Sequence, residues 1–174
     1  MYIKQANLFE FSSSFNNFYY FENSLISNVN IGYVSIFLNS DFWSIKKDLE
    51  NDIQRIFING KGIAFQTTAV VIDSNKQFIY IGVLPDYCDE DEEGFKPMVE
   101  DKSVLEHFQE NLLDNVRLTK DNFFYILRTW KKYLEEKPSF LLLYQNENDW
   151  FDILPFQSKE EMDQFIKEHT PITN

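Results

Sequence analysis

Few residues in this 174-residue sequence are suited to covalent chemistry: one cysteine, Cys88, and two histidines, His107 and His169. Cys88 lies between Asp86 and Asp89, and these negative charges disfavour the thiolate that nucleophilic catalysis requires. The two histidines fall in separate predicted helices, and neither has a second metal ligand at a recognisable spacing. The sequence therefore indicates neither a cysteine nucleophile nor a histidine metal site.

Short motifs of hydrolase and nucleotide chemistry are also missing. The sequence contains no G-x-S-x-G, no Walker A, no G-x-G-x-x-G and no H-E-x-x-H. We therefore predict that the chain is not an enzyme and has no catalytic residues and no cofactor. One enzymatic alternative stays open, because two carboxylates alone can hydrolyse a sugar linkage and the chain has 28 acidic residues.

The sharpest local feature is the stretch from Asp86 to Asp101, in which eight acidic residues accompany one lysine. Part of it matches a calcium-binding EF-hand loop, with these residues at loop positions 1, 3, 5, 6 and 12: Asp89, Asp91, Glu93, Gly94 and Glu100. The preceding FIYIGVLPDY is typical of a strand, whereas an EF-hand needs a helix there, and Pro97 stiffens the loop. We keep calcium regulation as an alternative and assign no metal site.

The same acidic stretch is better explained as a docking surface for a basic protein, because Tyr87, Phe95 and Met98 are interleaved with its acidic residues. Interfaces place aromatic anchors inside a charged rim, and complementary charge speeds encounter. The predicted partner-binding residues of this stretch are Asp86, Tyr87, Asp89, Glu90, Asp91, Glu92, Glu93 and Phe95. The alternative is a solvated charged loop that binds nothing.

A second candidate for partner binding is the polar turn Asn146–Trp150, with Asp149 and Trp150 as its predicted contact residues and Asp152 nearby. A tryptophan beside such a turn can anchor a partner, although packing over a sheet edge is the alternative. The basic residues Arg128, Lys131, Lys132 and Lys137 are interspersed with glutamates. They do not form the continuous basic face that nucleic acid requires.

The formal net charge of −12 limits the possible partners. It disfavours nucleic acid and anionic membrane surfaces and favours a cationic partner. A single cysteine forms no internal disulfide, the opening MYIKQANLFEF lacks the pattern of a signal peptide, and no apolar run reaches 18 residues. We therefore predict a cytoplasmic protein without a membrane span.

The stretch Thr119–Phe156 gives the clearest structural pattern. Apolar residues recur every three or four positions, which predicts a helix capped by Thr119 and ended by Lys137-Pro138. Strand-like Phe140–Tyr144, the turn NEND and Trp150–Phe156 then predict a hairpin. The helix face consists of Phe123, Ile126, Leu127, Trp130, Tyr133 and Leu134.

Elsewhere the patterns predict an alternation of strands and helices. Strands are expected at Tyr2–Phe11, Ile31–Leu38, Ile63–Ile72 and Phe78–Leu84, and helices at Phe42–Phe57, Ser103–Val116 and Ser158–His169. Ser158 and Glu161 form a capping box for the last helix. The predicted fold is a single α+β domain over residues 1–174, with one antiparallel sheet of five or six strands and helices mainly on one face.

In size, acidity, single cysteine and aromatic residues beside carboxylates, the chain resembles the immunity proteins of bacterial toxin systems, including contact-dependent growth inhibition. The residues that carry the resemblance are the run Asp86–Glu93 and the segment LLLYQNENDWFDILPF. The resemblance implies an inhibitor that covers the active or substrate-binding surface of a cognate toxin domain, often a basic nuclease. The rival expectation is a scaffold or phage accessory protein that acts through apolar surfaces.

Overall fold

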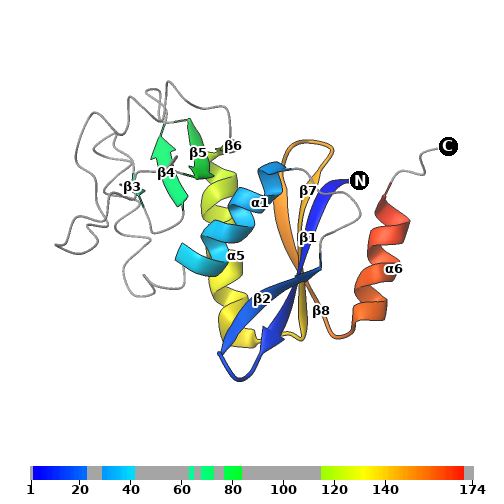
Figure 1. Ribbon diagram of the computed structural model, residues 1–174. Coiled ribbons are helices and arrows are strands. Elements are labelled where there is room, and N and C mark those ends of the chain that lie inside the picture. Colours follow the sequence, from blue (N-terminus) through cyan, green and yellow to red (C-terminus); the bar gives the residue numbers. More distant parts are fainter. Residues whose placement is uncertain are drawn as a thin grey trace.

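The computed structural model describes residues 2–22, 29–41, 63–64, 68–72, 77–83 and 115–170 and has an α+β fold (Figure 1). The first sheet has the order β2-β1-β7-β8. Its strands are β1 Ile3–Ser12, β2 Asn17–Glu22, β7 Phe140–Asn146 and β8 Phe151–Phe156. The second sheet consists of β4 Thr68–Ile72, β5 Phe78–Val83 and β6 Asn115–Thr119, with the two-residue β3 Ile63–Ala64 beside β4.

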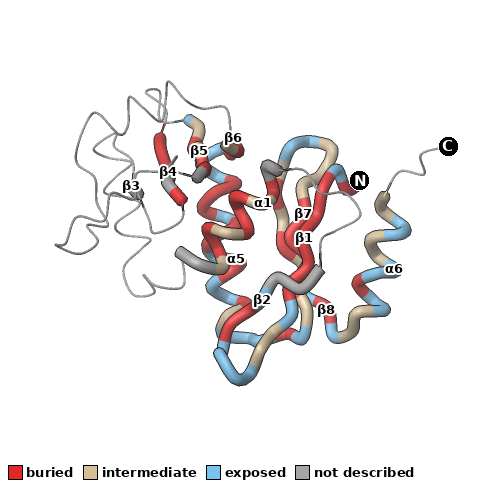
Figure 2. The backbone as a smooth tube through the Cα atoms, in the orientation of Figure 1, coloured by how far each residue is buried: buried red, intermediate tan, exposed pale blue. Residues whose placement is uncertain are grey.

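The α+β class and the antiparallel pairing are confirmed, but the prediction of one sheet of five or six strands is wrong. The described strands form two separate sheets, and helices cover both faces of the first sheet instead of mainly one. Helices α1 (Val29–Ile36) and α5 (Lys120–Glu136) lie between the two sheets, and α6 (Lys159–His169) covers the opposite face of the first sheet (Figures 1 and 2).

Helix α5 forms where the apolar periodicity predicts it. Thr119 is the N-cap, and its hydroxyl accepts a hydrogen bond from the Asn122 backbone N–H at 3.2 Å. Lys137 ends the helix in the left-handed conformation, with φ 53°, and its backbone N–H donates to the Tyr133 carbonyl at 2.8 Å. Of the predicted face, Phe123, Ile126, Leu127, Trp130 and Tyr133 are buried and Leu134 packs against the core.

Residues Ile31–Leu38 are helical, so the predicted strand is wrong. The segment comprises most of α1 and the first residues of the π-helix η1 (Phe37–Asp41). A helix that is apolar on all sides is stable when it is buried, and Ile31, Val34 and Leu38 belong to the core. Ser35 joins α1 to β1, because its hydroxyl donates to the Ile31 carbonyl at 2.9 Å and accepts from the Asn7 side chain at 2.6 Å. Tertiary burial here outweighs the strand preference of β-branched residues.

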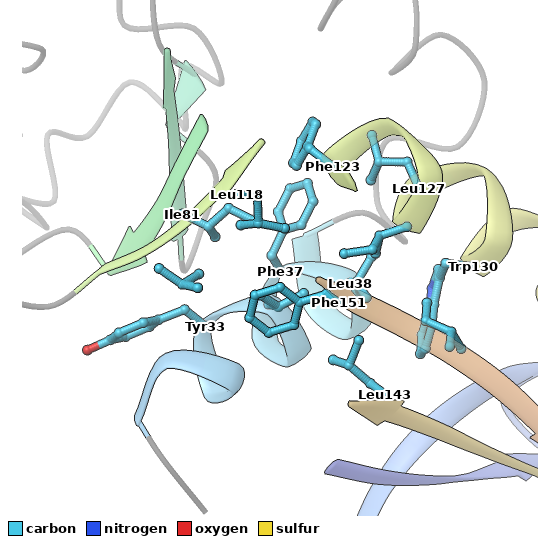
Figure 3. Close-up of a cluster of buried hydrophobic side chains, with 14 of the residues drawn as sticks. Tyr33, Phe37, Leu38, Ile81, Leu118, Phe123, Leu127, Trp130, Leu143 and Phe151 are labelled. Atoms are coloured by element: carbon cyan, nitrogen blue, oxygen red, sulfur yellow. The ribbon is translucent and has the colours of Figure 1, made fainter. Parts of the chain in front are cut away.

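The main core lies between the sheets and is built from both sheets and the helices between them (Figure 3). Tyr33, Phe37 and Leu38 come from α1 and η1, Phe123, Leu127 and Trp130 from α5, Ile81 and Leu118 from the second sheet, and Leu143 and Phe151 from the first. A smaller cluster on the other face of the first sheet includes Leu8, Leu142, Phe156 and, from α6, Met162. Both faces of β1 and β7 are therefore buried.

Two other predicted elements have different bounds in the structure. The strand expected at Ile63–Ile72 is divided, and its described parts β3 and β4 pair antiparallel. Val116, the expected end of a helix, lies in β6, which pairs with β5. Strands β1, β5, β7 and β8 and helix α6 are confirmed within a few residues. The helix expected at Phe42–Phe57 lies outside the described residues, as does the helix expected at Ser103–Val116 up to residue 114.

Candidate functional site

The structure describes one of the two predicted partner-binding regions. Asp149 and Trp150 lie at the junction of the β7–β8 turn and β8. The other predicted residues lie outside the described residues: Asp86, Tyr87, Asp89, Glu90, Asp91, Glu92, Glu93 and Phe95. The candidate site is therefore built around the β7–β8 hairpin.

The turn is shaped by Asn146, the last residue of β7. Its side-chain oxygen accepts from the backbone N–H of Asn148 at 2.9 Å and of Trp150 at 3.2 Å. Its backbone carbonyl also accepts from the Asp149 N–H at 3.1 Å, and Asp149 takes the left-handed conformation with φ 61°. Aspartate and asparagine tolerate that conformation and bond locally to the backbone, which is why this polar sequence makes a tight turn. The turn sets the position of Trp150 relative to β8.

Trp150 pairs with a tyrosine from another element. Its ring centroid lies 5.6 Å from that of Tyr125 on α5, with an interplanar angle of 47°. Tyr125 is 37% exposed and Trp150 is half-buried. The Trp150 ring thus packs against a neighbour, as the packing interpretation expects, and it still reaches solvent.

Asp152 is the polar centre of this arrangement. Its Oδ1 accepts from the Tyr125 hydroxyl at 2.6 Å and from the Ile153 backbone N–H at 2.7 Å. Its Oδ2 accepts from the Tyr144 hydroxyl at 3.2 Å. Among the described residues these donors are all uncharged, so none of them brings a cation to the Asp152 carboxylate beside the aromatic pair.

Both phenols in this cluster hold their protons strongly. Burial, followed by the hydrogen bond to the Asp152 carboxylate, raises the pKa of Tyr125 to about 12. Burial and the Asp152 charge also raise the pKa of Tyr144. A group that acts as general acid or base needs a pKa near the working pH, and these tyrosines are moved away from it. They act here as hydrogen-bond donors that orient a carboxylate.

Further carboxylates lie around the turn. Glu147 accepts from the Tyr2 backbone N–H at 2.7 Å, and hydrogen bonds from its own backbone N–H and that of Tyr2 lower its pKa. Asp149 forms an exposed ion pair with Lys4, and this hydrogen bond raises the pKa of Lys4. We call Tyr125, Glu147, Asp149, Trp150 and Asp152 the hairpin-end surface.

Asn122 ties α5 to the start of β8. Its side-chain N–H donates to the Phe151 carbonyl at 2.7 Å, and its side-chain oxygen accepts from the Phe151 N–H at 2.9 Å. Asn122 is buried, so this pair of bonds lies away from competing water. It fixes the end of α5 that carries Tyr125 against the strand that follows Trp150.

Sequence reasoning identified Asp149, Trp150 and the nearby Asp152, and the structure places all three together. It missed Asn122, Tyr125 and Tyr144. Tyr125 could have been found from the sequence, because it is an aromatic residue that lies outside the apolar face of a strongly amphipathic helix. Asn122 and Tyr144 could not, since their roles depend on contacts between separate elements.

The described part of the chain offers binding groups more readily than reactive ones. No group of three or more histidine, cysteine or acidic side chains within it is arranged to hold a metal ion. None of the helices that the structure describes has the length and apolar character needed to cross a membrane. The His169 ring stacks on that of Phe165 with the centroids 4.1 Å apart, and its Nδ1 is 2.8 Å from the Phe165 carbonyl. Both contacts lie within the last turn of α6.

The chain was compared with protein-family models, with curated proteins and with solved structures, and none of the three comparisons found a match.

Proposed function

We propose that this chain is an acidic protein-binding inhibitor: an immunity protein that neutralises a cognate basic toxin domain by covering its active or substrate-binding surface. The observation that carries the proposal is the Tyr125–Trp150 pair, held on the Asp152 carboxylate at the hairpin end. It combines an aromatic anchor with fixed negative charge, and this is the chemistry that a basic protein surface complements.

Pre-organisation supports a binding role. Tryptophan and tyrosine dominate the energetics of interfaces, and their contribution is greater when their side chains need no ordering on association. Tyr125 is held by its hydroxyl bond to Asp152, and the backbone at Trp150 is held by the Asn146 side chain. The anchor therefore exists before a partner arrives.

The charge distribution supports a cationic partner. The net charge of −12 attracts a basic protein over a long range, and Asp152 receives only uncharged donors within the described residues. The carboxylates would take the place of substrate phosphates against the lysine and arginine side chains of a nuclease. The acidic stretch Asp86–Asp101 belongs to the same proposal as a sequence-based prediction, and the protein would act in the cytoplasm.

A second candidate function, a scaffold that works through apolar contacts, is favoured by a different observation. Phe15 in the β1–β2 turn is 65% exposed and packs on Tyr19, which is 40% exposed, with ring centroids 5.3 Å apart. This pair has no described carboxylate in hydrogen-bond contact. A partner that binds there would recognise apolar surface, and its binding would persist at high salt.

Co-purification separates the two candidates. The tagged chain is expressed with the product of the adjacent upstream gene, where a toxin would be encoded, and the complex is washed at 0.1 M and 1 M salt, at which the screening lengths are about 10 Å and 3 Å. We expect stoichiometric retention of a basic, growth-inhibiting protein at low salt and reduced retention at high salt. Trp150→Ala should release it and the matched Tyr19→Ala should not. Loss through Tyr19→Ala alone would favour the scaffold, and no retained protein at either salt would reject the inhibitor.

A further inference from the structure

Helix α6 covers the face of the first sheet that lies away from α5 (Figures 1 and 2). Its Met162 is fully buried, whereas Phe165 and Ile166 are half-buried and pack against the small cluster on this face. Helix α5, by contrast, buries seven residues. Segments with few buried side chains open locally at the lowest free-energy cost, so α6 should detach from the sheet more readily than α5.

The ring of Phe165 contacts Tyr144, a residue of β7 that lies under α6. The two ring centroids are 6.2 Å apart and the planes make an angle of 64°, the edge-to-face geometry that aromatic pairs prefer. Tyr144 is 2% exposed, and the same Phe165 ring also packs on Phe156, with centroids 5.6 Å apart. The position of the Tyr144 ring thus depends on how α6 docks through Phe165.

Tyr144 also reaches the carboxylate of the hairpin-end surface. It lies directly opposite Asp152 in the β7–β8 ladder, and its hydroxyl donates to Asp152 Oδ2 at 3.2 Å. The other oxygen, Oδ1, accepts from the hydroxyl of Tyr125 on α5 at 2.6 Å. Two hydroxyl groups from different elements therefore hold one carboxylate, one at each oxygen. Such a carboxylate cannot rotate about its Cβ–Cγ bond without losing one of these hydrogen bonds.

We infer that the docking of α6 positions the aromatic anchor of the hairpin-end surface, and that Tyr144 and Asp152 connect the two. Phe165 places the Tyr144 ring, whose hydroxyl fixes the Asp152 carboxylate. That carboxylate in turn orients Tyr125 beside Trp150. Tyr144 is thus a positioning residue, which acts on a partner through Asp152. This inference rests on the proposed function and adds a control on the anchor from outside the hairpin-end surface.

Detachment of α6 would cost the anchor part of its pre-organisation. A side chain without fixed contacts must be ordered when the partner binds, and this lowers affinity. The coupling is reciprocal, because a partner that orders the anchor also favours the docked state of α6. The hairpin-end surface therefore binds most tightly in molecules in which α6 is docked.

The first test is a double-mutant cycle on the chain alone, measured by urea denaturation. Tyr125→Phe should raise the unfolding equilibrium constant about fivefold in the wild type, the effect of one lost hydrogen bond. In Phe165→Leu, which lacks the ring contact with Tyr144, the same change should raise it less than twofold. The control background is Ile166→Ala, which truncates another half-buried side chain of α6, and there the fivefold effect should return. A fivefold effect in both backgrounds would overturn the inference.

The second test observes the anchor directly by fluorine NMR. The full chain is labelled with fluorotryptophan, and the Trp150 signal is assigned by its loss in Trp150→Phe. Phe165→Leu should shift that signal, whereas Ile166→Ala should leave it in place. Phe165→Tyr keeps the ring contact and should restore the wild-type signal. If Phe165→Leu does not fold, Tyr144→Phe takes its place in both tests, because it keeps the ring and removes only the hydroxyl. An unchanged Trp150 signal would contradict the coupling.

Failure of this inference differs from failure of the proposed function, because neither test contains a partner. Coupling in both tests, together with no protein retained in the co-purification, would remove the inhibitor role and leave the positioning of the anchor by α6. A retained toxin domain together with an uncoupled anchor would leave the inhibitor role and remove α6 from it.

Discussion

Two pairs of aromatic rings reach solvent at opposite ends of the first sheet, and they are built differently. Tyr125 and Trp150 come from α5 and the β7–β8 hairpin, 5.6 Å apart, and a carboxylate holds the Tyr125 hydroxyl. Phe15 and Tyr19 belong to one hairpin, 5.3 Å apart. The Tyr125–Trp150 pair depends on contacts between distant parts of the chain, whereas the Phe15–Tyr19 pair is local.

This difference distinguishes a pre-organised surface from an exposed one. A surface residue that must be ordered on binding loses conformational entropy at that moment, and the contacts around Tyr125 remove part of this cost in advance. The Phe15–Tyr19 pair offers more apolar area and less directional chemistry. We therefore expect substitutions at the two pairs to have unequal effects on both stability and binding.

The largest effect on stability is expected from Asn122→Ala, which leaves both backbone groups of Phe151 without their buried partner. The loss should be about 2–4 kcal/mol, since an unsatisfied buried polar group costs roughly 1–3 kcal/mol. Urea denaturation measures it. Asn148→Ala, an exposed substitution in the adjacent turn, should change stability by less than about 0.5 kcal/mol. Similar losses in both variants would show that Asn122 does not hold the hairpin end.

Trp150→Ala should weaken partner binding about thirtyfold, the loss of roughly 2 kcal/mol that is typical of a central aromatic contact. Phe15→Ala should change affinity less than twofold. Isothermal titration with the co-purified partner compares the variants. A larger loss of affinity with Phe15→Ala than with Trp150→Ala would show that the partner binds at the Phe15–Tyr19 pair instead.

Tyr125→Phe removes the hydroxyl that bonds to Asp152 and should lower stability by about 1 kcal/mol. Tyr19→Phe is the control at the other pair, with an expected change below about 0.5 kcal/mol. Thermal unfolding at pH 7 gives the comparison. If the two variants have the same melting temperature, the hydrogen bond from Tyr125 to Asp152 does not stabilise the folded protein.

High pH should affect the Tyr125 end of the sheet selectively. The pKa of Tyr125 is raised from the ordinary value of 10.0 to about 12, so its folded state binds the proton more strongly than the unfolded state does. The associated stability is fully present below pH 10 and is lost as pH rises toward 12. Ultraviolet titration should reveal late-ionising tyrosine, and one such group should disappear in Tyr125→Phe. Loss of an early-ionising group instead would contradict the raised pKa.

The smallest effect is expected from Lys4→Gln, which breaks the ion pair with Asp149. Both side chains are exposed, and exposed ion pairs contribute little to stability because water and salt screen them. Stability should hardly change, while the added negative character should speed association with a basic partner at low salt. Stopped-flow measurements would check the rate, and a slower association would contradict the charge argument.

Local patterns predicted the C-terminal half of the fold well. The Thr119 cap, the apolar face of α5, the β7–β8 hairpin and the Ser158–Glu161 box are all confirmed, because each depends on residues a few positions apart. In α6 the Ser158 hydroxyl accepts from the Glu161 N–H, and the Glu161 carboxylate accepts from the Gln157 N–H, both at 3.2 Å. Neighbouring residues were sufficient to define these elements.

Long-range features could not be predicted in this way. The residues Ile31–Leu38 have strand-like composition and are helical because two sheets enclose them. The division into two sheets depends on which strands pair, and periodicity carries no such information. The same holds for the candidate site. Asp149 and Trp150 could be predicted from the sequence of the turn, whereas the roles of Asn122 and Tyr144 depend on tertiary contacts.

The central position of β1 in the first sheet has a kinetic consequence. β1 pairs with β7 across a wide sequence gap, with Gln5 and Gln145 separated by 140 residues. Such non-local pairing slows folding, and at a synthesis rate of roughly 5–20 residues per second β1 waits on the order of ten seconds for β7 to be made. The hairpin end, which needs β1, β7, β8 and α5 together, is then among the last parts of the described fold to be completed.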